Sequence, residues 1–170
     1  MKYQVIVLDL DGTLTNSKKE ITPPTRDALI EIQQNGKKVV LASGRPINGV
    51  APLAEELYLK EYGGFMLSFN GARITRCSDN AIIYNKVIPQ EVIRPIYEAV
   101  KEYPGLDLIS YTDKVILSGI KSNEYTEKEA AINSAAQAMQ TAAATSAMPS
   151  VSHSQDSSYR IFMRSSSPVR

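Results

Sequence analysis

Two acidic residues one position apart, Asp9 and Asp11, are the groups in this sequence best suited to chemistry. Two charged carboxylates held close together are costly to keep dry, so such a pair indicates a bound cation or a role in phosphate chemistry. The Asp9 carboxylate could attack an electrophilic phosphorus atom and form an aspartyl-phosphate. Asp11 could protonate the leaving oxygen and later activate water. The pair therefore predicts phosphoryl transfer, with Asp9 as the nucleophile and Asp11 as the acid and base.

A Mg²⁺ ion would suit this pair, bound by the carboxylate of Asp9 and the backbone carbonyl of Asp11. The ion would offset the repulsion between the acids and screen the charge of a phosphate. Gly12 permits a tight turn beneath them, and Thr13 follows it. The alternative is an Asx-type turn without chemistry. The apolar run before the pair and the sequence GTLTNS after it favour the chemical interpretation.

The elements that must position these acids begin with the apolar run at residues 5–8, VIVL. It predicts a strand that is buried on both faces and ends at Asp9. Four further segments continue the alternation: a helix at 25–36, a strand at 39–42, a helix at 48–59 and a strand at 65–69. This pattern predicts an α/β fold with a parallel sheet, whose strand ends open onto a ligand crevice. A hairpin with a polar turn is predicted at 72–88.

Polar residues also follow the second and third strands. Ser43 comes after the strand at 39–42, where its hydroxyl and the N–H groups of the next helix suit a phosphate oxygen, although a plain helix cap is the alternative. Gly44 lets the backbone approach a ligand, and Arg45 could meet a substrate anion or pair with a carboxylate. Asn70 begins an Asn-Gly pair, the strongest dipeptide signal for a two-residue hairpin turn. Because the carboxyl ends of parallel strands meet at one edge, these side chains and the acid pair are expected to converge.

Several other polar residues carry no predicted chemistry. Asn16 is either loop structure or part of the rim of the site, and His153, in a serine-rich stretch, is expected to be solvated. Four lysines are expected to be solvated surface groups: Lys18, Lys19, Lys37 and Lys38.

The second half of the chain has a different character. Residues 83–133 predict the start of a smaller α+β unit, with a helix at 89–103, strands at 106–112 and 114–120, and a helix at 123–133. Residues 134–170 are rich in Ala and Ser and are expected to be disordered after a frayed helical start. We therefore expect three parts: residues 1–82, residues 83–133 and the Ala/Ser-rich tail.

The bulk composition of the 170 residues excludes several classes of protein. A net charge of +1 gives no field to attract nucleic acid or an anionic membrane. No apolar run approaches the roughly 18 residues of a membrane span. A single cysteine, Cys77, excludes an internal disulfide and a multi-cysteine zinc site. The chain also enters its first strand without a signal-like segment, so a cytoplasmic protein is expected.

The segments VIVLDLDGTLTNS and VVLASGRP resemble motifs I and II of the haloacid dehalogenase (HAD) superfamily of phosphohydrolases. LSFNGA followed by an inserted unit is similar to the Cof-type branch, subfamily IIB. The resemblance covers about residues 1–133. It implies a HAD-like Rossmannoid parallel sheet with a C2-type cap, and a Mg²⁺-dependent phosphatase acting on a small phosphorylated metabolite such as a sugar phosphate. It also implies a set of substrate- and phosphate-binding residues: Gly12, Thr13, Ser43, Gly44, Arg45 and Asn70.

The sequence departs from that family in its last part. The motif III lysine and the acidic motif IV loop, which belong to a returning half of the core, have no counterpart between residues 134 and 170. We therefore expect an incomplete sheet with an exposed first strand, and impaired phosphatase activity. Two alternatives remain open: a sugar phosphomutase, and a catalytically inactive HAD fragment that binds phosphate or a partner.

Overall fold

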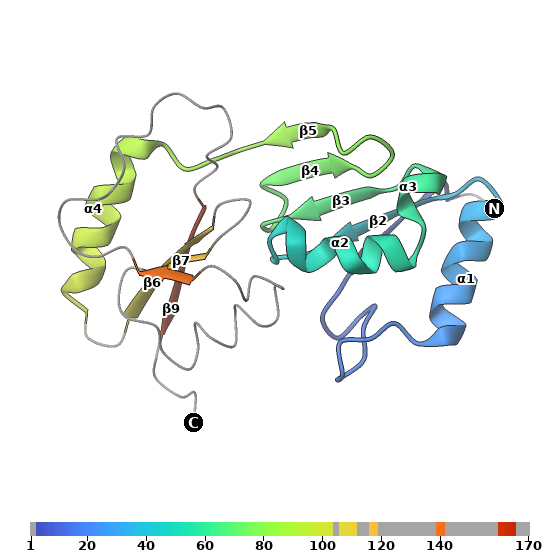
Figure 1. The fold of residues 1–170 in the computed structure, drawn as a ribbon, viewed down its shortest axis with the longest axis horizontal. Helices are drawn as coiled ribbons and strands as arrows, with labels where there is room; N and C mark the ends of the chain where they lie inside the picture. The colour runs from blue at the N-terminus through green and yellow to red at the C-terminus, as the bar shows by residue number, and fades with distance from the viewer. Residues whose placement is uncertain (1–2, 104–105, 112–115, 119–138, 142–159, 166–170) are drawn as a thin grey trace. The chain divides into compact units, whose positions relative to one another are not determined.

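The computed structural model describes residues 3–103, 106–111, 116–118, 139–141 and 160–165. The chain divides into two compact units, Met1–Lys86 and Val87–Arg170 (Figure 1). The first unit ends four residues after position 82, where the sequence pattern had placed the boundary. None of the helices in the part of the chain that the structure describes has the length and apolar character needed to cross a membrane.

The first unit is built on a five-stranded sheet in the order β1-β2-β3-β4-β5. The strands β1, β2 and β3 run parallel, and β4 and β5 extend the sheet as an antiparallel hairpin. The strand bounds are β1 Val5–Asp9, β2 Lys38–Ala42, β3 Phe65–Ser68, β4 Arg73–Arg76 and β5 Ile82–Asn85. This confirms the predicted α/β fold with a parallel sheet and a following hairpin.

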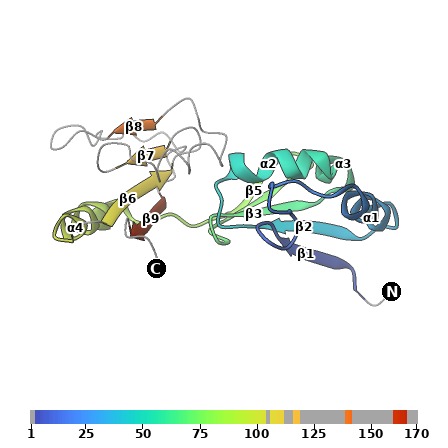
Figure 2. The same cartoon turned by 90° about the horizontal axis from the view of Figure 1, so that it is seen from below.

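Three helices connect the parallel strands: α1 (Pro23–Gln34), α2 (Ile47–Glu56) and α3 (Leu59–Tyr62). Because the strands follow chain order from β1 to β3, right-handed crossovers place both connections on the same face of the sheet. Figure 2 shows α2 and α3 on one side of the strands. α1 begins with two prolines, whose fixed φ and missing N–H suit the first turn of a helix.

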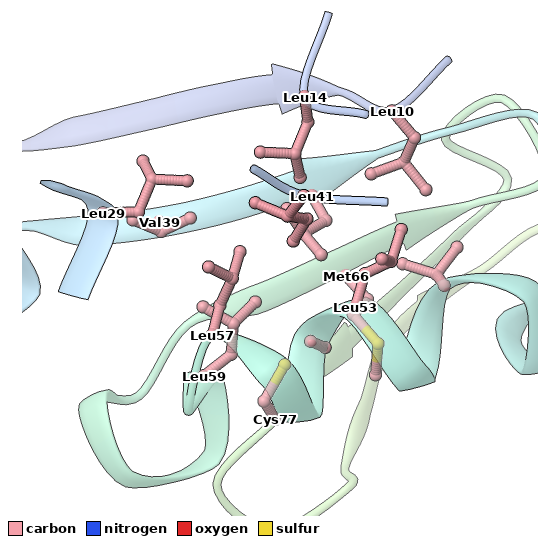
Figure 3. Packing of buried hydrophobic residues seen from close by; sticks show 13 residues of the cluster. Leu10, Leu14, Leu29, Val39, Leu41, Leu53, Leu57, Leu59, Met66 and Cys77 are labelled. Carbon is pink, nitrogen blue, oxygen red and sulfur yellow. The ribbon is translucent and has the colours of Figure 1, made fainter. Parts of the chain in front are cut away.

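The hydrophobic core lies between these helices and the sheet. Leu29 of α1 and Leu53 of α2 pack with Val39 and Leu41 of β2, and both β2 side chains are fully buried (Figure 3). Alternate residues of the parallel strands therefore point toward the helices. The loop after β1 contributes Leu10 and Leu14 to the same core, which anchors the turn that follows Asp9.

The prediction that the first strand is buried on both faces is wrong. The strand β1 lies at the end of the sheet and pairs only with β2 among the described strands. Val5 and Val7 are 52% and 58% exposed, and they alternate with the partly buried Ile6 and Leu8. The physical reason is that all three helices of this unit cover the other face. The exposed first strand expected for an incomplete sheet is thus observed.

The second unit contains one described helix, α4 (Gln90–Lys101), and a four-stranded sheet in the order β8-β7-β6-β9. Ile93 and Val100 of α4 are buried, as are Leu108 and Ile109 of β6, one of the two inner strands of the sheet. The strand bounds are β6 Leu106–Tyr111, β7 Ile116–Ser118, β8 Met139–Thr141 and β9 Arg160–Ser165. The α-β-β start of this unit agrees with the sequence pattern.

Two of these strands lie in the stretch that was expected to be a disordered tail. All six residues of β9 pair in antiparallel register with β6, and β8 pairs in parallel with β7. The segment RIFMR contains three consecutive large apolar residues, which favour a strand despite the Ala/Ser-rich surroundings. The predicted helix at 123–133, the junction between the two predicted strands at residue 113, and His153 lie outside the described residues.

Candidate active site

The carboxyl ends of β1 and β2 lie side by side. Asp9, the last residue of β1, pairs in register with Ala42, the last residue of β2. Ser43 is the next residue in the chain, so the nucleophile candidate and the phosphate-binding candidate begin from adjacent strand ends. The Asp9 side chain is exposed and makes no hydrogen bond or ion pair with another residue in the described ranges. A carboxylate in that state is free to meet a metal ion or an electrophile.

The turn after β1 is anchored on the side that faces the hydrophobic core. Leu10 and Leu14 are buried in the core, and the Leu10 carbonyl accepts hydrogen bonds from both the N–H and the hydroxyl of Thr15, each 2.9 Å long. Gly12 has a φ of 82°, a left-handed conformation that glycine adopts without steric cost. Asp11 therefore emerges on the exposed side of a turn whose apolar side is anchored.

Two cations hold the Asp11 carboxylate. Arg45 donates from Nη2 to Oδ1 at 2.6 Å and from Nε to Oδ2 at 3.1 Å, and Lys19 donates from Nζ to Oδ1 at 2.7 Å. The hydrogen bonding to Arg45 is the main reason that the pKa of Asp11 lies below its usual value, and Lys19 adds to this lowering against the opposing effect of partial burial. Both carboxylate oxygens are thus engaged, and Asp11 is held in its charged form.

The loop after β2 carries Ser43, Gly44 and Arg45. Ser43 is buried, its N–H donates to the carbonyl of Leu67 at 2.9 Å, and its hydroxyl accepts the N–H of Arg45 at 3.2 Å. The cap position of α2 is occupied by Pro46, so the plain helix-cap interpretation of Ser43 is wrong. Arg45 also donates from Nη1 to the carbonyl of Gly49 in the first turn of α2, at 3.3 Å. These bonds fix the loop so that the guanidinium reaches Asp11.

The loop after β3 lies directly against the loop after β2. The Asn70 N–H donates to the Ser43 carbonyl at 3.0 Å, and the Phe69 N–H donates to the Arg45 carbonyl at 2.9 Å. A Cβ atom placed on Gly44 would lie 2.9 Å from Asn70 Oδ1, so the glycine is what allows this close approach.

The predicted Asn-Gly turn is displaced by one residue along the chain. Gly71 N–H donates to the Ser68 carbonyl, which makes Phe69 and Asn70 the two central residues, both with a φ of 55°. A left-handed backbone is unusual for a bulky residue such as phenylalanine. The backbone bonds to the loop after β2 stabilise it, so the turn geometry and the contact with Gly44 depend on each other.

The structure therefore brings most of the predicted site residues to one edge of the sheet. Direct contacts join Asp11, Ser43, Gly44, Arg45 and Asn70, and strand register places Asp9 beside them. Gly12 and Thr13 lie in the exposed turn next to Asp11.

Sequence reasoning assigned Lys19 to the solvated surface, whereas the structure pairs it with Asp11. The signal that could have found it is the turn-forming Asn16 three residues earlier, which folds this stretch back toward the acid pair. The Oδ1 atom of Asn16 accepts the N–H groups of Lys18 and Glu20, so loop structure is its observed role.

A magnesium ion would find part of its coordination here. Asp9 offers a free carboxylate and Asp11 a backbone carbonyl, while the Asp11 side chain is occupied by two cations. No group of three or more His, Cys, Asp or Glu side chains that could hold a metal lies within the described residues. Mg²⁺ commonly binds through one or two carboxylates and completes its shell with waters and substrate phosphate. The donors present fit an ion held in that way.

Comparisons with known proteins identify relatives of this chain. A family model described as haloacid dehalogenase-like hydrolase matches residues 6–157, which extends past residue 133, where the resemblance in the sequence ended. Two Bacillus subtilis relatives are YxeH, 35% identical over 96 residues, and the 5-amino-6-(5-phospho-D-ribitylamino)uracil phosphatase YcsE, 30% identical over 95 residues. Each alignment covers 56% of this chain.

Solved structures show the same fold. A haloacid dehalogenase-like hydrolase from Bacteroides thetaiotaomicron is 44% identical, has a TM-score of 0.73 and covers 82% of this chain. A HAD subclass IIB sugar phosphatase is 26% identical, has a TM-score of 0.56 and covers 74% of this chain. The chain spans 36% of the length of the two Bacillus relatives and 52% and 46% of the two solved chains.

Proposed function

Because this chain belongs to the haloacid dehalogenase-like hydrolase family, we propose that it is a phosphatase that hydrolyses a small phosphorylated metabolite through an aspartyl-phosphate on Asp9. The observation that carries the proposal is the difference between the two acids. Asp9 is exposed without a partner among the described residues, whereas Asp11 is held by Arg45 and Lys19. A free carboxylate suits a nucleophile, and an oriented one suits proton transfer.

The reaction divides into two steps. In the first, an Asp9 oxygen forms a bond to phosphorus while the bond to the leaving oxygen breaks, and that oxygen receives a proton from Asp11. In the second, Asp11 takes a proton from water as the water attacks phosphorus, which releases inorganic phosphate and restores Asp9. The ionised state of Asp11 described above is the one that the second step requires. The first step requires a proton on Asp11, which the bonds to Arg45 and Lys19 disfavour, so at least one of these bonds must loosen when the substrate binds.

The remaining residues of the edge would receive the phosphate. The backbone of Gly12, Thr13 and Gly44, the Ser43 hydroxyl and the Asn70 amide offer hydrogen bonds, and Arg45 offers charge. Mg²⁺, held by the Asp9 carboxylate and the Asp11 carbonyl, would neutralise phosphate charge in the transition state. The Ser43 hydroxyl accepts a hydrogen bond from the Arg45 N–H. To contact the substrate, it must either give up this bond or keep it and donate its own proton to a phosphate oxygen.

A sugar phosphate or a similar polyol phosphate is the substrate class we favour. Two relatives support it by their names, one a sugar phosphatase and the other a phosphatase of a phosphorylated ribitylamino compound. The single cysteine agrees with action in the reducing cytoplasm.

A second candidate is a HAD-type domain that binds phosphate without turnover. It is favoured by the state of Asp11, because Arg45 and Lys19 bind its carboxylate and lower its pKa, whereas hydrolysis begins with a protonated acid. Such a domain would bind phosphate at the same edge but would form no covalent intermediate.

The test is to capture the intermediate. The 170-residue chain is incubated with Mg²⁺ and a sugar monophosphate, quenched in acid and analysed by mass spectrometry for phosphate on Asp9. Asp9→Asn should give neither intermediate nor inorganic phosphate. Asp11→Asn should slow both the formation of the intermediate and its hydrolysis, because an amide can neither protonate the leaving oxygen nor activate water. Normal phosphate release by Asp9→Asn would disprove the nucleophile. Phosphate binding without an intermediate in the unsubstituted chain would support the second candidate.

A further inference from the structure

The Asp11 carboxylate receives a contact from a part of the chain outside the loops after β2 and β3. Lys19 reaches it from a short loop, residues 16–20, which we call the Asn16 loop. The site described above already orients Asp11 through Arg45, so a second cation on the same oxygen calls for an explanation. An exposed ion pair between freely moving side chains contributes little, so the role of Lys19 depends on how rigidly the loop holds it.

The base of the Asn16 loop is anchored in the core. Thr15 and Ile21, the residues on either side of it, are both buried and lie opposite each other in an antiparallel bridge. Thr15 forms a second bridge with Asp11. The two ends of the loop are therefore held together, next to the acid that Lys19 contacts.

The tip of the Asn16 loop is closed by its first residue. Asn16 donates its N–H to the Glu20 carbonyl at 3.0 Å and accepts the Lys19 N–H on its own carbonyl at 2.9 Å. Its side-chain oxygen accepts the N–H groups of Lys18 at 2.8 Å and Glu20 at 3.1 Å. Four hydrogen bonds within five residues give this loop one backbone shape.

Lys19 occupies the strained position of that shape. Its φ is 65°, in the left-handed region that non-glycine residues rarely adopt. The neighbouring Lys18 has no hydrogen bond or ion pair from its ammonium group to the described residues. A conformation of this kind is retained when the surrounding bonds determine it, and here they turn the lysine stem toward Asp11.

We propose that Lys19 is a positioning residue, which ties the Asn16 loop to the Asp11 carboxylate and, together with Arg45, fixes the orientation of that carboxylate. Lys19 and Arg45 share Oδ1, while Arg45 alone binds Oδ2. Lys19 comes from the segment after β1 and Arg45 from the segment after β2, so the two cations reach the carboxylate from different parts of the chain. Rotation of the carboxylate would therefore break a bond to one of them. The value of this orientation for proton transfer rests on the function proposed above, whereas the orientation itself does not.

The experiment compares three variants of the full chain at neutral pH. Lys19→Met keeps the length of the side chain without its charge, Lys19→Arg restores a cation, and Lys18→Met is the matched control. Both positions are exposed, so the variants should fold, which circular dichroism checks. NMR couplings between Hα and the two Hβ protons of Asp11 report how many side-chain rotamers it populates.

We expect couplings of a single rotamer in the unsubstituted chain, in Lys19→Arg and in Lys18→Met, and averaged couplings in Lys19→Met. With a sugar monophosphate and Mg²⁺, Lys19→Met should lower kcat by roughly one to two orders of magnitude with little change in KM, and Lys19→Arg should recover most of it. Unchanged couplings in Lys19→Met, or an equal effect of Lys18→Met, would overturn the proposal. Altered couplings without turnover in any variant would support the positioning role and count against the phosphatase function.

Discussion

The Arg45 guanidinium and the Asp11 carboxylate make two hydrogen bonds, 2.6 Å and 3.1 Å long, across 34 positions of the chain. This fork-to-fork contact joins the loop after β1 to the loop after β2. Only 11% of the Arg45 side chain is exposed, so the contact is better shielded from water than a typical surface pair. The acid pair and the candidate phosphate-binding loop therefore form one structural unit.

Arg45→Lys should disrupt this contact between the two loops although it preserves the charge. A lysine ammonium cannot make the two parallel bonds to a carboxylate and also reach the Gly49 carbonyl. We expect kcat/KM toward a sugar monophosphate to fall by roughly tenfold or more, with thermal stability nearly unchanged. Arg26→Lys is the control, because Arg26 pairs with its exposed neighbour Asp27 on the surface of α1. Equal activities of the two variants would show that the forked geometry is dispensable.

The sequence predicted the convergence of these side chains where strand ends determine it. Asp9 ends one parallel strand, and Ser43 and Asn70 follow two others; the register of a parallel sheet brings such positions to one edge regardless of loop details. Lys19 was missed because its approach to Asp11 depends on a left-handed residue and on the Asn16 side chain, and periodicity contains no information about either. The burial of β1 was overestimated because an apolar sequence indicates only that a strand can be buried on both faces. It does not indicate whether other elements are present to cover each face.

Gly44→Ala should move Asn70 without unfolding the protein. The new methyl group would lie 2.9 Å from Asn70 Oδ1, and this exposed amide can rotate away. We expect a shifted side-chain amide signal of Asn70 in NMR and weaker inhibition by inorganic phosphate, with a stability change below about 1 kcal/mol. Gly36→Ala is the contrast: its φ of 77° with open space around it should cost about 1 kcal/mol and leave the Asn70 signal unchanged. An unshifted Asn70 signal in Gly44→Ala would mean that the two loops are less closely packed than described.

Gly64→Ala should destabilise the first unit through overpacking. A Cβ atom at this position would lie 2.7 Å from the Val39 carbonyl oxygen and 3.1 Å from the Leu59 side chain, both in the core. Backbone atoms cannot move aside cheaply, so we expect a loss of about 1–3 kcal/mol. Urea denaturation measures this directly. A loss no larger than that of Gly36→Ala would indicate that the start of β3 can shift to accept the methyl group.

Cys77 should report the local stability of the core. Its thiol is buried, and burial raises its pKa to about 11. At pH 8 roughly one thiol in a thousand would be ionised, against about one in four for an unfolded chain, so labelling should be slower by at least two orders of magnitude. Stability should fall as the pH rises from about 8.5 toward 11, because the unfolded thiol ionises first. Cys77→Ala should lack this alkaline decline, and rapid labelling of the native protein at pH 8 would contradict the burial.

The edge of β1 should promote self-association. Its outer backbone groups have no strand partner among the described residues, and Val5 and Val7 expose apolar side chains beside them. An unprotected apolar edge is a template for pairing with another chain. Val7→Lys places a charge there at little cost, because the side chain is already 58% exposed. We expect the light scattering of concentrated samples to be lower for Val7→Lys than for the unsubstituted chain. Hydrogen exchange of the Ile6 and Leu8 amides then shows whether an intermolecular partner protects the strand. Tyr103→Lys removes a comparably exposed side chain, 61%, from the segment that follows α4 and should leave the scattering unchanged. If both variants lowered it equally, general surface hydrophobicity rather than the β1 edge would be the cause.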